Sequence, residues 1–284
     1  MIFSRKRRSE SPAVEVSATL DSLSAWEELI GQNPHFRDGT YLRELGERVV
    51  ASGATEPLTN ASIGPGELAN TGDLREGLTY KFVNSRMRAV MLCIQWVLAD
   101  QPWMNAKIYA TEAVTAFALR LRGIFPKFIG SEYTESEEQR KELYPILCED
   151  LQELSFPDDS FHVVTTSEVL EHVPSIDGAL AEIHRVLQPG GWHVGTAPFA
   201  MAQYPSVVKA KLDKGQVVYL SEPEYHGNPV DERGSLVFEV PGWDILDRAK
   251  AVGFREAHVK FIMSTQFACL SSDAGGIFVF CFQK

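Results

Sequence analysis

The 284-residue sequence is poor in cysteine, with only Cys93, Cys148, Cys269 and Cys281. They form no CxxC pair, which argues against a thiolate zinc cluster and against a disulfide framework. Cys93 and Cys281 fall in apolar runs, so we expect both to be buried thiols. This cysteine usage is typical of a reducing compartment, and we therefore expect a cytoplasmic protein.

Long apolar runs and an excess of positive charge are lacking as well. No stretch approaches the roughly 18 consecutive apolar residues of a membrane-spanning helix, so no membrane span is expected. No apolar segment follows the basic residues 5–8, which argues against a secretory signal. The formal net charge is -11, and a negative field disfavours binding to nucleic acid.

Residues 149–198 carry the clearest pattern of secondary structure. Residues 161–166 are apolar, β-branched and bounded by turn residues, which predicts a buried strand. A helix is predicted next from apolar residues at helical spacing, Ile176, Leu180, Ile183 and Leu187. Ser175 is its expected N-cap, residues 189–191 its expected stop, and residues 192–198 a second strand. Strand, helix and strand together predict a βαβ unit with parallel strands.

Three regions are expected along the chain. Residues 1–20 are predicted to be a disordered basic N-terminus, and residues 21–105 a helical cap with a loop rich in Gly and Pro. Residues 106–284 are predicted to form the main α/β domain, interrupted by a polar insertion at residues 199–235. Further strands of that domain are predicted at residues 107–110, 128–133, 146–148, 254–263 and 277–282.

Several short motifs follow one another in a fixed order. They are Glu149-Asp150-Leu151, the run from Leu154 to Phe161, Leu170-Glu171-His172-Val173, and Leu187-Gln188-Pro189-Gly190-Gly191. In order and spacing they resemble the class I S-adenosylmethionine-dependent methyltransferases, of the type 11 kind. The resemblance implies a doubly wound, Rossmann-like, mostly parallel sheet of seven strands, with the last strand inserted between its neighbours. It also implies S-adenosyl-L-methionine as the cofactor.

Ligands of open α/β sheets lie outside the carboxyl ends of the strands, so we expect the site there. Glu132 ends the second strand, where an acceptor-only carboxylate would hold ribose hydroxyls. The resemblance implies that Asp150 and the Leu151 backbone contact the adenine, that Tyr133 packs on its edge and that Ser167 lies near the methionine part. Asp150 has a second interpretation, as a turn aspartate that caps its own loop.

The turn after the first strand departs from the family pattern. Residues 111–116 contain no glycine, although the family uses glycine there to let the backbone approach the cofactor. Either the turn takes another shape, or cofactor binding is altered or lost. Within it, Glu112 and Ala113 are the candidate cofactor contacts, with Glu112 facing the ammonium group. Glu112 is alternatively an acid that only favours a helix dipole.

Two histidines are candidates for a general base, because imidazole titrates near neutrality. His172 lies in the Leu-Glu-His-Val motif, and His226 lies in the insertion beside Glu224. His172 is alternatively a packing residue, and His226 a loop histidine bonded to backbone. Glu171 and Glu224 are the other candidate bases. The sequence indicates no metal cluster.

Two functions follow as hypotheses. The first is a methyltransferase acting on a small-molecule or glycan acceptor, most simply at a hydroxyl oxygen. The second is a methyltransferase-like binding or regulatory protein without catalysis, which the glycine-free turn favours. A nicotinamide cofactor is a weaker third option, because no G-x-G-x-x-G motif is present. Neither the acceptor atom nor the oligomeric state follows from the sequence.

Overall fold

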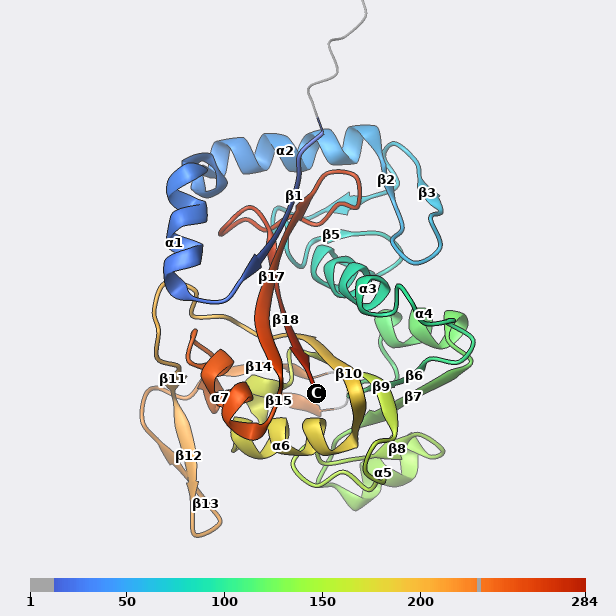
Figure 1. Ribbon diagram of the computed structural model, residues 1–284, viewed down its shortest axis with the longest axis vertical. Helices are drawn as coiled ribbons and strands as arrows, with labels where there is room; N and C mark the ends of the chain where they lie inside the picture. Colours follow the sequence, from blue (N-terminus) through green and yellow to red (C-terminus); the bar gives the residue numbers. More distant parts are fainter. Residues whose placement is uncertain (1–12, 229–230) are drawn as a thin grey trace, which may run out of the picture.

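The computed structural model describes residues 13–228 and 231–284, and a single eight-stranded sheet forms its centre (Figure 1). In spatial order the strands are β1 (Glu15–Leu20), β17 (Glu256–Ser264), β18 (Ile277–Gln283), β10 (Leu187–Thr196), β9 (Phe161–Ser167), β6 (Lys107–Ala110), β7 (Lys127–Glu132) and β8 (Leu147–Cys148). From β10 to β8 all neighbours are parallel, and β18 is antiparallel to both β10 and β17. The predicted doubly wound, mostly parallel sheet is confirmed, including the last strand inserted between its neighbours.

The eighth strand, β1, was not expected. It pairs antiparallel with β17, from Glu15 opposite Ser264 to Leu20 opposite Val259. The prediction of disorder up to residue 20 is therefore wrong for Glu15–Leu20, while residues 1–12 lie outside the described residues. Without β1, the backbone N–H and C=O groups along one edge of β17 would have no strand to bond, and the pairing satisfies them.

Helices cover both faces of the sheet. They are α1 (Leu23–Gln32), η1 (Pro34–Arg37), α2 (Gly39–Ser52), α3 (Ser85–Val97), α4 (Ala116–Ile124), α5 (Glu137–Leu143), η2 (Leu170–His172), α6 (Ile176–Val186) and α7 (Ile245–Val252). One apolar core lies under α3 and α4, and it contains Cys93 and Cys281, whose predicted burial is confirmed. A second core lies under α6 and α7 and continues to α1 and α2.

Helix α6 begins as predicted and ends earlier than predicted. The Ser175 hydroxyl accepts a hydrogen bond from the Gly178 amide, which confirms the N-cap. The predicted stop at residues 189–191 is wrong, because the helix ends at Val186 and β10 begins at Leu187. Leu187 is fully buried and pairs with Phe161, and the register with β9 shifts before Trp192 to accommodate the Pro-Gly-Gly segment.

The N-terminal segment and the insertion contribute short hairpins around this frame. The N-terminal strands are β2 (Ala54–Thr55), β3 (Ser62–Ile63), β4 (Ala69–Asn70) and β5 (Leu78–Thr79). The segment after β10 holds β11 (Val207–Val208), β12 (Ala210–Asp213), β13 (Gln216–Tyr219), β14 (Tyr225–Asn228), β15 (Asp231–Leu236) and β16 (Glu239–Val240). No helix among the described residues is long and apolar enough to cross a membrane.

Candidate active site

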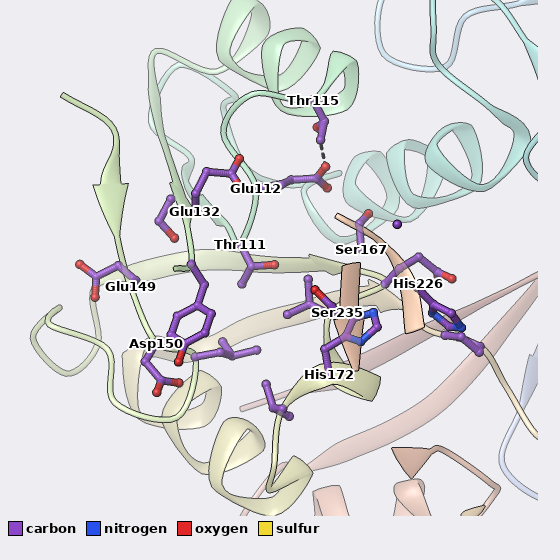
Figure 2. Close-up of a pocket in the computed structure, with 18 of the residues that line it drawn as sticks. Thr111, Glu112, Thr115, Glu132, Glu149, Asp150, Ser167, His172, His226 and Ser235 are labelled. Carbon is purple, nitrogen blue, oxygen red and sulfur yellow. Dashed lines mark hydrogen bonds between the residues drawn. The ribbon is translucent and has the colours of Figure 1, made fainter. Parts of the chain in front are cut away.

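A pocket of about 820 Å³ opens at the carboxyl ends of β6, β7, β8 and β9 (Figure 2). Eight of the nine residues predicted for the site line it: Glu112, Glu132, Tyr133, Asp150, Leu151, Ser167, His172 and His226. The ninth, Ala113, is buried directly behind the lining. Leu212 of the β12–β13 hairpin also lines the pocket, so the insertion forms part of its wall.

The glycine-free turn is held by Glu132. Its Oε1 atom accepts hydrogen bonds from the amides of Ala113 at 2.8 Å and Val114 at 3.1 Å. All of residues 111–116 are described, and none has a positive φ, so this turn needs no glycine for its backbone angles. Room for it comes from Gly130 of β7, where an added Cβ would lie 2.6 Å from the Glu112 carbonyl oxygen.

Glu112 presents a carboxylate to the pocket from this turn. The Thr115 hydroxyl donates to its Oε2 atom, whereas Oε1 is buried with no hydrogen-bond partner among the described residues. Burial raises the pKa of Glu112, although Thr115 and the positive charge of Arg86 act in the opposite direction. An unpaired, buried carboxylate oxygen would be satisfied by a cationic group of a ligand.

The opposite side of the pocket is formed by the residues after β7 and β8. Asp150 accepts a hydrogen bond on Oδ1 from the Gln152 amide at 2.8 Å, so it does cap its own turn while it lines the pocket. Leu151 is buried beside it, and the Tyr133 ring is half exposed at the rim. Glu149 is engaged by the amide and the hydroxyl of Ser155.

An ion-pair network that sequence reasoning missed joins the N-terminal segment to the pocket. Arg86 of α3 lies 2.9 Å from Glu76 and 3.7 Å from Glu168, and Arg75 lies 2.7 Å from Glu168. Burial by itself disfavours the ionised form of Glu168, but Arg86 and Arg75 outweigh it and lower the pKa of this carboxyl. Arg86 and Glu168 are far apart in sequence, and neither belongs to a motif that would have indicated the pairing.

The end of the pocket away from Asp150 is lined by His172 and His226 (Figure 2). Their rings meet edge to face, with centroids 5.2 Å apart. His172 donates from Nδ1 to the Leu236 carbonyl at 2.9 Å, and His226 donates from Nε2 to the Glu224 carboxylate at 2.9 Å. The alternative interpretation of His226, as a loop histidine bonded to backbone, is wrong, because the hydrogen-bond partner of its Nε2 is the Glu224 carboxylate.

Glu171 lies between the two histidines and is fully buried. Its Oε1 atom is 3.5 Å from His172 Nε2 and 3.7 Å from His226 Nδ1. Glu171 and Glu224 raise the pKa of His226 to about 9, against the opposing effect of burial. The sequence indicates no metal site. The fold nevertheless brings Glu171, His172 and His226 together, although His226 lies in the insertion, far from the other two along the chain.

Part of this chain is similar to known proteins. Residues 110–195 match the family described as "Methyltransferase domain". The sterol 24-C-methyltransferase of Pneumocystis carinii is 35% identical over 108 residues, which are 38% of this chain and 23% of that protein. The 27-O-demethylrifamycin SV methyltransferase of Amycolatopsis mediterranei is 28% identical over 131 residues, 42% of this chain and 47% of that protein. The chain thus spans less than half the length of each of these two relatives.

Some solved structures are similar to this chain at low sequence identity. An S-adenosylmethionine-dependent methyltransferase of Mesorhizobium loti is 16% identical, with a TM-score of 0.44 over 67% of this chain and 97% of that chain. An amino pentose methyltransferase of Micromonospora echinaspora, solved with S-adenosylmethionine bound, is 15% identical, with a TM-score of 0.43 over 69% of this chain and 89% of that chain.

Proposed function

Residues 110–195 of this chain are a methyltransferase domain of the S-adenosylmethionine-dependent class, and from this premise we propose that the protein methylates a hydroxyl oxygen of a small-molecule or glycan acceptor. The observation that carries the proposal is one continuous pocket. Two buried acids, Glu112 and Glu132, line one part of it, and a histidine pair lines another.

The residues present fit S-adenosylmethionine. The unpaired Oε1 atom of Glu112 suits an ammonium group, and Glu132, which holds the turn through Oε1, keeps Oε2 for ribose hydroxyls. Asp150 likewise keeps Oδ2 for an adenine amino group, beside Leu151 and Tyr133. When bound, the cofactor supplies a methyl group that is already activated on a sulfonium sulfur.

The chain's own task is then to align the acceptor, exclude water and remove a proton from the hydroxyl. Leu212 of the insertion and Val169 add apolar surface to the wall, which favours water exclusion around a compact acceptor. We assign the hydroxyl end to His172 and His226, because these two side chains line the pocket next to the buried Glu171.

The hypothesis of a non-catalytic binding protein depended on the glycine-free turn. That turn lines the pocket without any left-handed residue, and Gly130 provides the space that it needs. The geometry therefore gives no reason to expect that the cofactor site is closed, and we favour the enzyme.

Calorimetry of the full chain with S-adenosylmethionine and with S-adenosylhomocysteine tests the cofactor site. We expect micromolar binding of both, and a loss of about tenfold or more in Glu132→Gln and Asp150→Ala, because each change alters a group that faces the ligand. Glu137→Gln is the matched control, since the Glu137 side chain is 82% exposed on α5 and does not line the pocket.

Failure of both ligands to bind the wild-type chain would contradict the proposal and restore the non-catalytic hypothesis. If the cofactor binds, methyl transfer is followed with a panel of hydroxylated acceptors. His226→Gln is then expected to lower kcat by about 10²–10⁴-fold while the cofactor affinity stays unchanged.

A further inference from the structure

Three potential ligand atoms converge at the histidine end of the pocket. Glu171 Oε1, His172 Nε2 and His226 Nδ1 all lie within 4.8 Å of one another. They come from two separate parts of the chain, since Glu171 and His172 belong to η2 and His226 belongs to β14. The two imidazoles line the pocket, and the carboxylate lies behind them with no solvent exposure.

In each ring, the nitrogen that faces away from Glu171 makes a hydrogen bond, and this bond determines the tautomer. A carbonyl and a carboxylate can only accept, so His172 carries its proton on Nδ1, facing Leu236, and neutral His226 carries its proton on Nε2, facing Glu224. The lone pairs of His172 Nε2 and His226 Nδ1 therefore point inward. Histidines that ligate metals commonly donate their other N–H to a carbonyl or a carboxylate, as both do here.

With His226 neutral, as a metal ligand must be, the centre of the cluster contains acceptors and no donor. A bound cation would displace the proton that Glu171 and Glu224 favour on His226. Neither oxygen of the buried Glu171 carboxylate has a hydrogen-bond partner among the described residues, although such groups are normally satisfied. Its 3.5 and 3.7 Å separations from the histidine nitrogens exceed the usual hydrogen-bond range. They are close to the roughly 3.3–3.6 Å between neighbouring ligands of a tetrahedral ion whose bonds are about 2.0–2.2 Å.

We propose that Glu171, His172 and His226 bind one divalent transition-metal ion, for which Zn²⁺ is the best match. Two imidazoles and one carboxylate form a donor set suited to Zn²⁺, and a site with three protein ligands leaves a position open. That position faces the pocket, because both histidines line it. Glu224 is then an outer positioning residue that orients His226 through its Nε2–H.

Metal binding at this cluster does not depend on methyl transfer, but its part in catalysis rests on the proposed function. An acceptor hydroxyl that fills the open position would lose its proton more easily, since a bound cation stabilises the alkoxide. The metal would then lower the pKa of the hydroxyl, and the released proton would pass to solvent water and not to a histidine.

The test uses the full-length chain, stripped with a chelator and titrated with Zn²⁺ and with Co²⁺. We expect one ion per chain, and visible Co²⁺ absorption bands typical of a low-coordinate site. Glu171→Gln and His226→Gln are each expected to weaken binding by at least 100-fold, and Glu224→Gln by about 10–100-fold. His35→Gln, an exposed histidine on η1, is the matched control and should bind like the wild type.

Thermal unfolding is the second readout. Zn²⁺ should raise the Tm of the wild type and of His35→Gln, and should leave the Tm of Glu171→Gln unchanged. The proposed metal site would be overturned by equal Zn²⁺ affinity in the wild type and Glu171→Gln, or by wild-type Zn²⁺ binding no tighter than millimolar. The cluster would then hold a proton and not a metal ion. Calorimetry of the same samples with S-adenosylhomocysteine separates this result from failure of the proposed function, because Glu171→Gln leaves the cofactor residues intact.

Discussion

At the scale of single residues, Gly130 shows how the glycine-free turn at residues 111–116 is accommodated. Residues 111–116 contain no glycine, and the space that this turn needs comes from Gly130 on the neighbouring strand. Gly130 lies in β7 beside Ala110 of β6, and its missing side chain lets the Glu112 backbone lie close against β7. The small residue that this packing requires therefore lies in the neighbouring strand and not in the turn.

Gly130→Ala is expected to displace this turn. The new Cβ would lie 2.6 Å from the Glu112 carbonyl oxygen, a backbone atom that cannot rotate away. We expect a loss of roughly 1–3 kcal/mol of unfolding free energy, typical of overpacking, and at least tenfold weaker binding of S-adenosylmethionine. Urea unfolding and calorimetry measure the two effects.

Gly123→Ala is the matched control for that variant. Gly123 lies within α4, and nothing is within 4 Å of the position its Cβ would take. Alanine in place of a helical glycine should stabilise the fold by about 0.5–1 kcal/mol and leave the cofactor affinity unchanged. Equal cofactor affinity in both variants would contradict the role given to Gly130.

At the scale of elements, α3 ties the N-terminal segment to the sheet through a buried arginine. Arg88 is 1% exposed and donates to four backbone carbonyls, those of Leu78, Val83, Phe267 and Ala268. Burial lowers its pKa to about 10, so it remains charged at neutral pH. One side chain thus joins β5, the start of α3 and the loop between β17 and β18.

Arg88→Met is expected to destabilise the fold by about 3 kcal/mol, because it leaves buried carbonyls without donors. Urea unfolding followed by circular dichroism measures the change. Arg43→Met, at an exposed position on α2, should change the unfolding free energy by less than about 0.5 kcal/mol. A similar small effect in both variants would show that the carbonyls find other donors.

At the scale of the whole molecule, stability should depend on pH through a histidine in the middle of the sheet. His193 of β10 is fully buried, bonds the Thr166 hydroxyl through Nε2, and has no partner for Nδ1 among the described residues. Burial lowers its pKa to about 3. Its folded-state pKa is below the unfolded value of about 6.5, so the unfolded chain binds the proton first as the pH falls.

The resulting stability is complete above pH 6.5 and decreases as the pH falls from 6.5 toward 3. The slope from this one group is about 1.4 kcal/mol per pH unit. Between pH 7.5 and pH 5.0, the unfolding free energy of His193→Gln is expected to fall by about 2 kcal/mol less than that of the wild type, as measured by urea unfolding. His35→Gln, which changes an exposed histidine, should follow the wild-type curve; identical curves for all three chains would contradict the assignment.

Much of the fold could be predicted because it depends on local pattern. The strand at Phe161–Ser167, the N-cap at Ser175 and the final antiparallel pair follow from apolar periodicity and turn residues. β1 was missed because an edge strand has weak local preference and forms only where β17 offers an edge. The end of α6 was misplaced because burial of Leu187 in β10 overrides the Pro-Gly-Gly signal.

By itself, the sequence determined the order of strands and helices and the acids at the strand ends, because these depend on near neighbours along the chain and on the parallel sheet they imply. Only the tertiary structure decided the pairing of Arg86 with Glu168 and the meeting of His226 with Glu171 and His172. The physical reason is that such contacts join distant segments. Their distances, burial and lone-pair directions are set by packing across the whole sheet, which no local pattern records.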